Sequence, residues 1–139
     1  MLHPQKYKDL QYGLKREVDY KPALERIVGK PLRKMANPYA VFDFLSEDGQ
    51  TKVELKSRTF YKLRYGTTMI GADKVAEATE DTWFFFAFTD CLCWIRYDKD
   101  LFSGFERRVM GRQDRGCNEF KEYVLIPVRS LETSKIVML

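Results

Sequence analysis

The predicted fold is decided by one stretch, residues 39–56, which reads YAVFDFLSEDGQTKVELK. Both ends of this stretch are rich in residues that favour β-strands. Between them lies Asp48-Gly49, the pair that favours a two-residue hairpin turn with positive φ at both positions. The sequence therefore predicts two antiparallel strands joined by that turn.

Counting outward from the turn sets the register of this hairpin. Leu45 would pair with Lys52, and Asp43 would lie directly opposite Glu54. Alternation then predicts a core face made of the apolar residues Phe42, Phe44, Val53 and Leu55. The opposite face would carry Asp43, Glu54 and Lys56.

Two carboxylates facing each other across a hairpin need a compensating interaction. Side chains directly opposite in an antiparallel pair lie about 5 Å apart at Cβ, where like charges destabilise the pair. A shared proton, a nearby cation such as Lys56, or a bound Mg²⁺ ion would relieve the repulsion. The alternative is an exposed face on which Asp43 and Glu54 alternate with lysines.

The order acid, then acid-X-Lys on the next strand, carried here by Asp43 and Glu54-Leu55-Lys56, resembles the PD-(D/E)XK nuclease superfamily. The resemblance implies an α/β fold with a restriction endonuclease-like core, in which helices flank a central mixed β-sheet. It also implies Mg²⁺-dependent hydrolysis of DNA phosphodiester bonds, with Mn²⁺ as a substitute. Asp43 and Glu54 would hold the metal, and Lys56 would orient the attacking water or stabilise negative charge.

Residues 5–28 are predicted to form a helix. Tyr7, Leu10, Leu14 and Val18 recur at helical spacing and predict an apolar stripe. Pro22 should kink or restart the helix, and Gly29 should end it.

Glu17 falls at the edge of that stripe, where it would face the sheet. The first helix of the superfamily often supplies an acid to the site, and residues 13–17 resemble that pattern, so Glu17 is a candidate catalytic residue and Glu25 a weaker one. The alternative is an ordinary helix pair between Glu17 and Lys21.

Residues 57–71 combine basic and aromatic side chains, a composition that suits phosphate contacts and base stacking. The candidate nucleic-acid-binding residues here are Arg58, Lys62 and Arg64. A surface loop whose aromatic residues cover the core is the alternative. Lys74, at the start of a helix predicted over residues 72–80, would reach the scissile phosphate or remain a solvated lysine. This region also resembles viral and phage members of the superfamily.

Residues 83–88 form a continuous apolar run, typical of a strand that is covered on both faces. Because the run follows a strand, a loop and a helix, we expect a crossover to a central sheet position, with a further strand over residues 91–97. A C-terminal β-hairpin is predicted from residues 107–110 and 122–128. Its polar loop contains Arg112, Gln113 and Arg115, which would contact nucleic acid or only solvent.

Length and composition predict a single domain, residues 1–139. The net charge of +4 permits nucleic-acid binding. The first residues contain no apolar run and no stretch is long enough to span a bilayer, so an intracellular protein without a membrane partner is expected. DNA is the expected partner, and the small size is compatible with a homodimer.

The sequence contains few residues that suit other kinds of catalytic or metal site. His3 is the single histidine, which excludes a Ser-His-Asp triad, and no phosphate-binding glycine loop is present. The three cysteines, Cys91, Cys93 and Cys117, are expected to be reduced and packed rather than to bind zinc. A catalytically inactive nucleic-acid-binding module and a structural subunit remain alternatives to the nuclease.

Overall fold

The computed structural model describes residues 4–37, 39–112 and 119–134. The larger of its two sheets contains, in spatial order, β1 (Leu32–Lys34), β2 (Phe44–Ser46), β3 (Lys52–Ser57), β5 (Thr82–Ala87), β6 (Leu92–Arg96) and β9 (Glu132–Ser134). The smaller sheet contains β4 (Thr67–Gly71), β8 (Glu119–Pro127) and β7 (Glu106–Arg112). The helical segments are α1 (Pro4–Val28), η1 (Lys62–Arg64), α2 (Ala72–Ala76), α3 (Lys99–Ser103) and η2 (Val128–Ser130).

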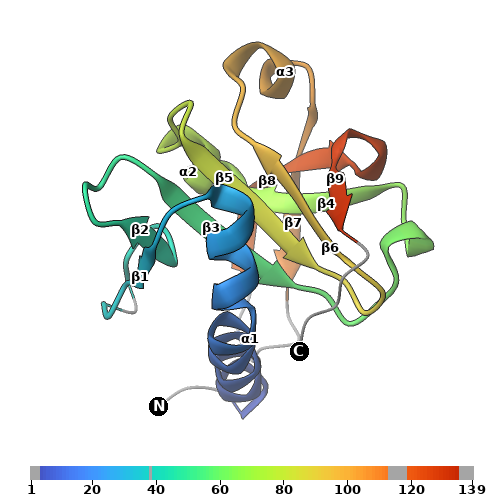
Figure 1. Ribbon diagram of the computed structural model, residues 1–139. Helices are drawn as coiled ribbons and strands as arrows, with labels where there is room; N and C mark the ends of the chain where they lie inside the picture. Colours follow the sequence, from blue (N-terminus) through green and yellow to red (C-terminus); the bar gives the residue numbers. More distant parts are fainter. Residues whose placement is uncertain (1–3, 38, 113–118, 135–139) are drawn as a thin grey trace.

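These elements form three layers. Helix α1 lies across one face of the six-stranded sheet, and the three-stranded sheet packs on the other (Figure 1). Each interface has its own apolar cluster: Leu24, Val53 and Phe85 belong to the one under α1, and Phe84 and Val124 to the one between the sheets. The chain is therefore α/β, with a mixed sheet and few helices.

The predicted hairpin register is confirmed, but its predicted turn is wrong. Phe44 pairs with Val53 and Leu45 with Lys52, as counting outward from Asp48-Gly49 required. The turn itself is longer, because Ser46 and Thr51 form the last backbone hydrogen bond that links the strands. Of the two expected positive φ angles only that of Gly49, at 73°, is found. A four-residue loop centred on the same dipeptide leaves the register unchanged.

The prediction for Phe42 is also wrong. Phe42 packs in the cluster between the sheets, with its ring 6.5 Å from that of Phe84, whereas Phe44, Val53 and Leu55 face α1. Alternation fails here because β2 begins only at Phe44, and the chain bends over the three residues before it.

The central strand β5 matches its prediction. Phe84 and Phe86 face the smaller sheet while Phe85 and Ala87 face α1, so the strand is covered on both sides. It runs parallel to β3, and the connection between the two passes through β4 and α2. Helix α2 is shorter than the predicted 72–80.

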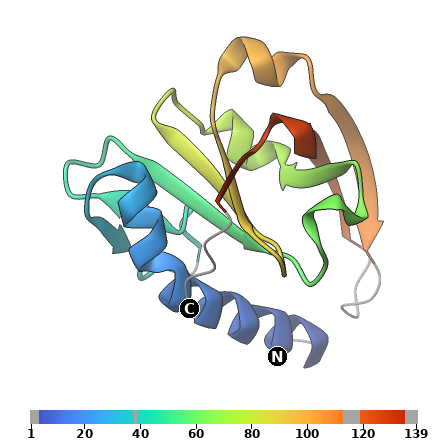
Figure 2. The ribbon, with the colours of Figure 1, turned by 45° about the vertical axis from the view of Figure 1, so that its right-hand side comes forward.

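The apolar stripe predicted for α1 is wrong in its described part. Leu14 and Val18 are exposed, and the buried face consists of Glu17, Tyr20, Ala23 and Leu24. The N-terminal half of α1 extends beyond the edge of the sheet (Figure 1), and the helix axis changes direction part-way along (Figure 2). The helix remains continuous through Pro22. It ends at Gly29, which has a φ of 87°.

The C-terminal hairpin, β7 with β8, is present. It belongs to the smaller sheet because β8 also pairs with β4, a strand within the segment predicted to be a loop. Some residues with predicted roles lie outside the described part of the chain: His3, Gln113, Arg115, Cys117, and the side chains of Tyr7, Leu10 and Arg112. Among the helices that are described, none combines the length and apolar character that crossing a membrane requires.

Candidate active site

Glu54 is the most deeply buried charged group of the predicted site. It lies on β3, between β2 and β5, with a side chain only 2% exposed. Burial and, to a lesser extent, the charge of Asp43 together raise the pKa of its carboxyl to about 7, although Lys56 and Lys74 act in the opposite direction. Burial and the neighbouring charge both disfavour the ionised form of Glu54. Perturbed pKa values of this kind are common at functional sites.

Two lysines hold Glu54 from opposite sides. The Nζ atom of Lys56 lies 3.2 Å from Oε2, and the Nζ atom of Lys74 lies 3.5 Å from Oε1. The Lys74 ammonium also donates to the backbone carbonyl of Val41. The Lys56 side chain is 40% exposed and that of Lys74 only 17%. Lys56 therefore remains accessible to a ligand, while Lys74 is tied into the surrounding structure.

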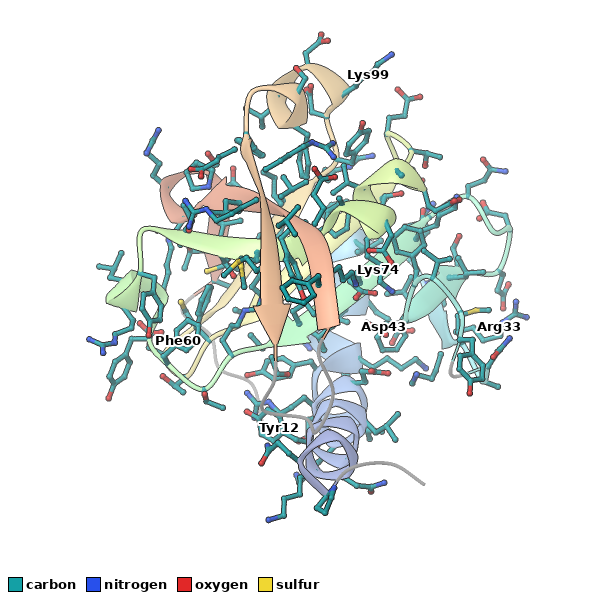
Figure 3. All side chains as sticks on the ribbon, turned by 180° about the vertical axis from the view of Figure 1, so that it is seen from behind. Tyr12, Arg33, Asp43, Phe60, Lys74 and Lys99 are labelled. Atoms are coloured by element: carbon teal, nitrogen blue, oxygen red, sulfur yellow. The ribbon has the colours of Figure 1, made fainter. Side chains whose placement is uncertain are left out.

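Asp43 lies just before β2, in the bend next to the pair formed by Phe44 and Val53. Its Oδ2 atom accepts a hydrogen bond of 2.8 Å from the backbone N–H of Leu55. Asp43 and Lys74 lie near each other on the same side of the molecule (Figure 3). The hydrogen bond fixes the Asp43 carboxylate beside β3, where its charge raises the pKa of Glu54.

Glu17 belongs to the same cluster. Its residue is 9% exposed, and burial raises the pKa of its carboxyl. The charge of Asp43 raises that pKa further, and Lys56 lowers it, which places Glu17 within electrostatic range of both. Of the four residues that were predicted to be catalytic, Asp43, Glu54 and Lys56 are thus grouped on and beside β3, and Glu17 lies within electrostatic range of Asp43 and Lys56.

The partner of Glu17 is Lys34, a residue for which the sequence predicted no role. Lys34 Nζ lies 2.5 Å from Glu17 Oε1, and Lys34 comes from β1, a three-residue strand. The expected helix partner, Lys21, instead lies 3.9 Å from Glu25. Glu25 accepts a hydrogen bond from the backbone N–H of Leu32, which gives it a structural role at the end of α1.

The donor set fits a hard divalent cation. Glu54 Oε1 is buried and has no hydrogen-bond partner among the residues that the structure describes, since its contact with Lys74 is an ion pair at 3.5 Å. Asp43 offers a second carboxylate, and Mg²⁺ commonly takes one or two carboxylates together with water and phosphate oxygens. No cluster of three or more His, Cys, Asp or Glu side chains that could hold a metal occurs within the described part of the chain. Substrate and solvent would therefore have to supply most of the coordination.

The predicted nucleic-acid-binding residues are only partly brought together. Lys74 joins the site. Arg58 is largely buried between the sheets, where it donates to Thr68 Oγ1 at 3.2 Å and to the carbonyl of Met69 at 2.7 Å. Burial lowers the pKa of Arg58 to about 10. These contacts favour a structural role for Arg58 over the expected phosphate contact.

Lys62 and Arg64 lie on η1, away from Glu54. Lys62 Nζ bonds to the hydroxyl of Thr133 on β9, which is three strand positions from β3 in the larger sheet, or about 14 Å. Figure 3 shows Phe60, which precedes η1, on the opposite side of the molecule from Asp43. The bond of Lys62 to β9 therefore disfavours the predicted role of η1 in binding the phosphate that Lys56 would reach.

Two other features of the molecule are poor candidates for a phosphate site. Cys91 and Cys93 are free and buried, as expected, and burial raises the pKa of the Cys91 thiol, so it is a poor nucleophile. An open hollow of about 1060 Å³ near Trp83 and Trp94 contains neither Glu54 nor Lys56. Acids outnumber bases in the lining of the hollow, which disfavours phosphate binding there.

Comparison of the chain with protein-family models, with curated proteins and with solved structures found no match. The geometry of the cluster around Glu54 is therefore the basis on which a function can be assigned.

Proposed function

We propose that this protein is a Mg²⁺-dependent nuclease of the PD-(D/E)XK type that hydrolyses phosphodiester bonds in DNA. The observation that carries the proposal is the setting of Glu54, a buried carboxylate paired with two lysines beside Asp43, with one oxygen that accepts no hydrogen bond from the described residues. A merely solvated face would leave these acids exposed, with pKa values set by water. Phosphoryl transfer requires preorganised positive charge at the phosphate, which lysines and a metal ion held by carboxylates would supply.

The arrangement of elements supports the same proposal. Helix α1 brings Glu17 to the sheet, the β2–β3 hairpin brings Asp43 and Glu54 together, and the crossover to parallel β5 brings in Lys74. We propose that these elements form a restriction endonuclease-like core, to which the smaller sheet is added.

Each residue has a distinct task in the proposed reaction. Asp43 and Glu54 would hold the ion, which when bound supplies charge neutralisation at the phosphate and a lower pKa for water. Lys56 is exposed enough to hydrogen-bond the attacking water or the non-bridging phosphate oxygens. Lys74 keeps Glu54 oriented through its ion pair and its bond to Val41. Glu17, paired with Lys34, would accept a hydrogen bond from water at the edge of the site.

A nucleic-acid-binding module without turnover is the second candidate. The observation that favours it is the absence of a cluster of three or more metal-ligating side chains among the described residues. Such a module would bind DNA through the same lysines but would not need Asp43.

The decisive test is cleavage of single-stranded, duplex and branched DNA with Mg²⁺, with Mn²⁺, with Ca²⁺ and with EDTA. We expect cleavage with Mg²⁺ or Mn²⁺, binding without efficient cleavage with Ca²⁺, and no cleavage with EDTA. Lys56→Ala is the control for a contaminating nuclease, because the purified variant should bind DNA and not cut it. Binding without cleavage under every metal condition would establish the second candidate instead.

A further inference from the structure

The β7–β8 hairpin extends out of the core, and one of its faces remains directed toward the space between the two sheets. On β8, Val124 and Ile126 are buried in the cluster that contains Phe84. Alternation along the strand places Phe120 on the same face, opposite Gly111 of β7. Yet Phe120 is 72% exposed, and Val109, on the same face of β7, is 65% exposed. This part of the hairpin therefore overhangs the larger sheet without covering it.

The side of the larger sheet that the hairpin overhangs is the side that bears Glu54. Glu54 pairs with Phe84 in parallel register, so the two side chains share a face, and Phe84 belongs to the same apolar cluster as Val124. The hairpin is also tied to the site through α2. Lys121, next to Phe120, lies 3.3 Å from Asp73, and the adjacent Lys74 holds Glu54.

The exposed ring of Phe120 is held in position. A Cβ atom placed on Gly111 would lie 2.7 Å from Cε1 of the Phe120 ring, so the ring lies across the glycine, in the space that a side chain would otherwise occupy. A ring fixed in this way loses little conformational freedom when another flat group stacks on it. Single exposed apolar residues are ordinary, but this ring is held in position on the face of the hairpin that is directed toward the side of the larger sheet bearing Glu54.

The same face provides a cation. Arg107 Nη1 lies 3.4 Å from Glu122 Oε1, with both side chains about half exposed. An exposed pair of this kind contributes little stability, so the guanidinium can exchange the carboxylate for a phosphate. Aromatic rings interleaved with cations are the usual means of holding a nucleic-acid strand.

We propose that the hairpin face formed by Arg107, Val109, Gly111 and Phe120 binds the DNA strand that enters the site, with one base stacked on Phe120. The inference rests on the proposed function because it names the substrate contact of that same site. It also predicts a preference for DNA with unpaired bases near the cleaved bond, since a paired base offers no free face for stacking.

The test measures the affinity of the full-length protein for a fluorescent single-stranded oligonucleotide in Ca²⁺, by anisotropy. Phe120→Ala should raise the Kd at least about fivefold, the lower end of the range for loss of one stacked base. Phe120→Trp should stay within about twofold of wild type because it keeps a stacking surface. The matched control is Leu63→Ala, which removes an apolar side chain that is 80% exposed on η1, and it should leave the Kd unchanged.

Gly111→Ala tests the position of the ring without removing it. The added methyl group must displace the Phe120 ring, so we expect weaker DNA binding. Thermal stability should be retained, since alanine costs less conformational entropy than glycine in a strand. Quenching of a 2-aminopurine base near the cleaved bond should be lost in Phe120→Ala and in Gly111→Ala.

The outcomes separate this inference from the proposed function. Weaker binding by the two hairpin variants, with a wild type that binds but never cuts, would support the hairpin contact and overturn the hydrolase. A wild type that cuts DNA while both variants bind normally would overturn the hairpin contact alone. A dimer that dissociates on Phe120→Ala with unchanged DNA affinity would also overturn it, because the face would then join two copies of the chain. A wild type that binds no DNA would overturn both proposals.

Discussion

Replacing Glu54 by glutamine should change the pH dependence of stability more than any other single substitution in the site. In metal-free protein the carboxyl of Glu54 has a pKa of about 7, against an ordinary value of 4.5. Because the folded-state pKa is raised, the folded state favours the protonated form. The stabilising contribution of Glu54 is then fully present below about pH 4.5 and is lost as the pH rises through about 7.

The size of the effect follows from the shift. A difference of about 2.5 pKa units corresponds to about 3 kcal/mol, at 1.36 kcal/mol per unit. Glutamine has nearly the shape of protonated glutamate and does not titrate. The free energy of unfolding of Glu54→Gln minus that of wild type should therefore rise by about 3 kcal/mol between pH 4.5 and pH 8.

Urea unfolding in EDTA, repeated at half-unit steps of pH, measures this difference directly. The control is Glu47→Gln, which removes an exposed carboxylate from the hairpin loop and should track wild type at every pH. Excess Mg²⁺ at pH 8 should stabilise the wild type but not Glu54→Gln, since only the ionised carboxylate binds the ion. A difference that stays constant within about 1 kcal/mol across the pH range would refute the argument that burial strains Glu54.

Three further substitutions test the remaining assignments. Asp43→Asn should leave the metal-free fold at least as stable as wild type and should abolish the Mg²⁺-dependent rise in Tm. A variant that keeps both this rise and its activity would exclude Asp43 as a ligand. Lys56→Ala should abolish cleavage while DNA binding falls only modestly. The control Lys52→Ala, two residues before Glu54 on the same strand, should still cleave DNA. Equal cleavage rates for Lys56→Ala and wild type would remove Lys56 from the mechanism. Arg58→Ala should lower the free energy of unfolding by about 2 to 3 kcal/mol, because two charged hydrogen bonds are lost, while the exposed Arg64→Ala should change it by less than about 0.5 kcal/mol. If Arg58→Ala instead unfolds like wild type but binds DNA poorly, the phosphate-binding interpretation of Arg58 is right.

Local signals were enough to predict the hairpin and its register. Alternation over residues 52–56 and the Asp-Gly dipeptide both act within a few residues, so they fix the register. The same locality explains why the turn type was wrong, since a four-residue loop around Gly49 gives the same pairing. The central position of β5 was predictable because its run of aromatic residues needs cover on both faces.

Contacts between distant segments were not predictable in this way. Strand β4 is defined by its pairing with β8, which lies more than fifty residues later in the sequence, and its own residues also suit a loop. Lys34 was missed because β1 is only three residues long, and nothing near it in sequence indicates that Glu17 lies across from it. The stripe through Leu14 and Val18 has helical period, but periodicity does not reveal where the sheet beneath the helix ends.

The acidic and basic side chains of the site balance one another in charge. Among the described residues, the acids Glu17, Asp43 and Glu54 are matched by the lysines Lys34, Lys56 and Lys74. The cluster is thus close to neutral when every group is ionised, and a divalent cation alone would leave it with excess positive charge. A phosphodiester, which carries a single negative charge, halves that excess, so metal and DNA should each raise the affinity for the other. Substrate would therefore supply both negative charge and the coordination that the carboxylates do not complete.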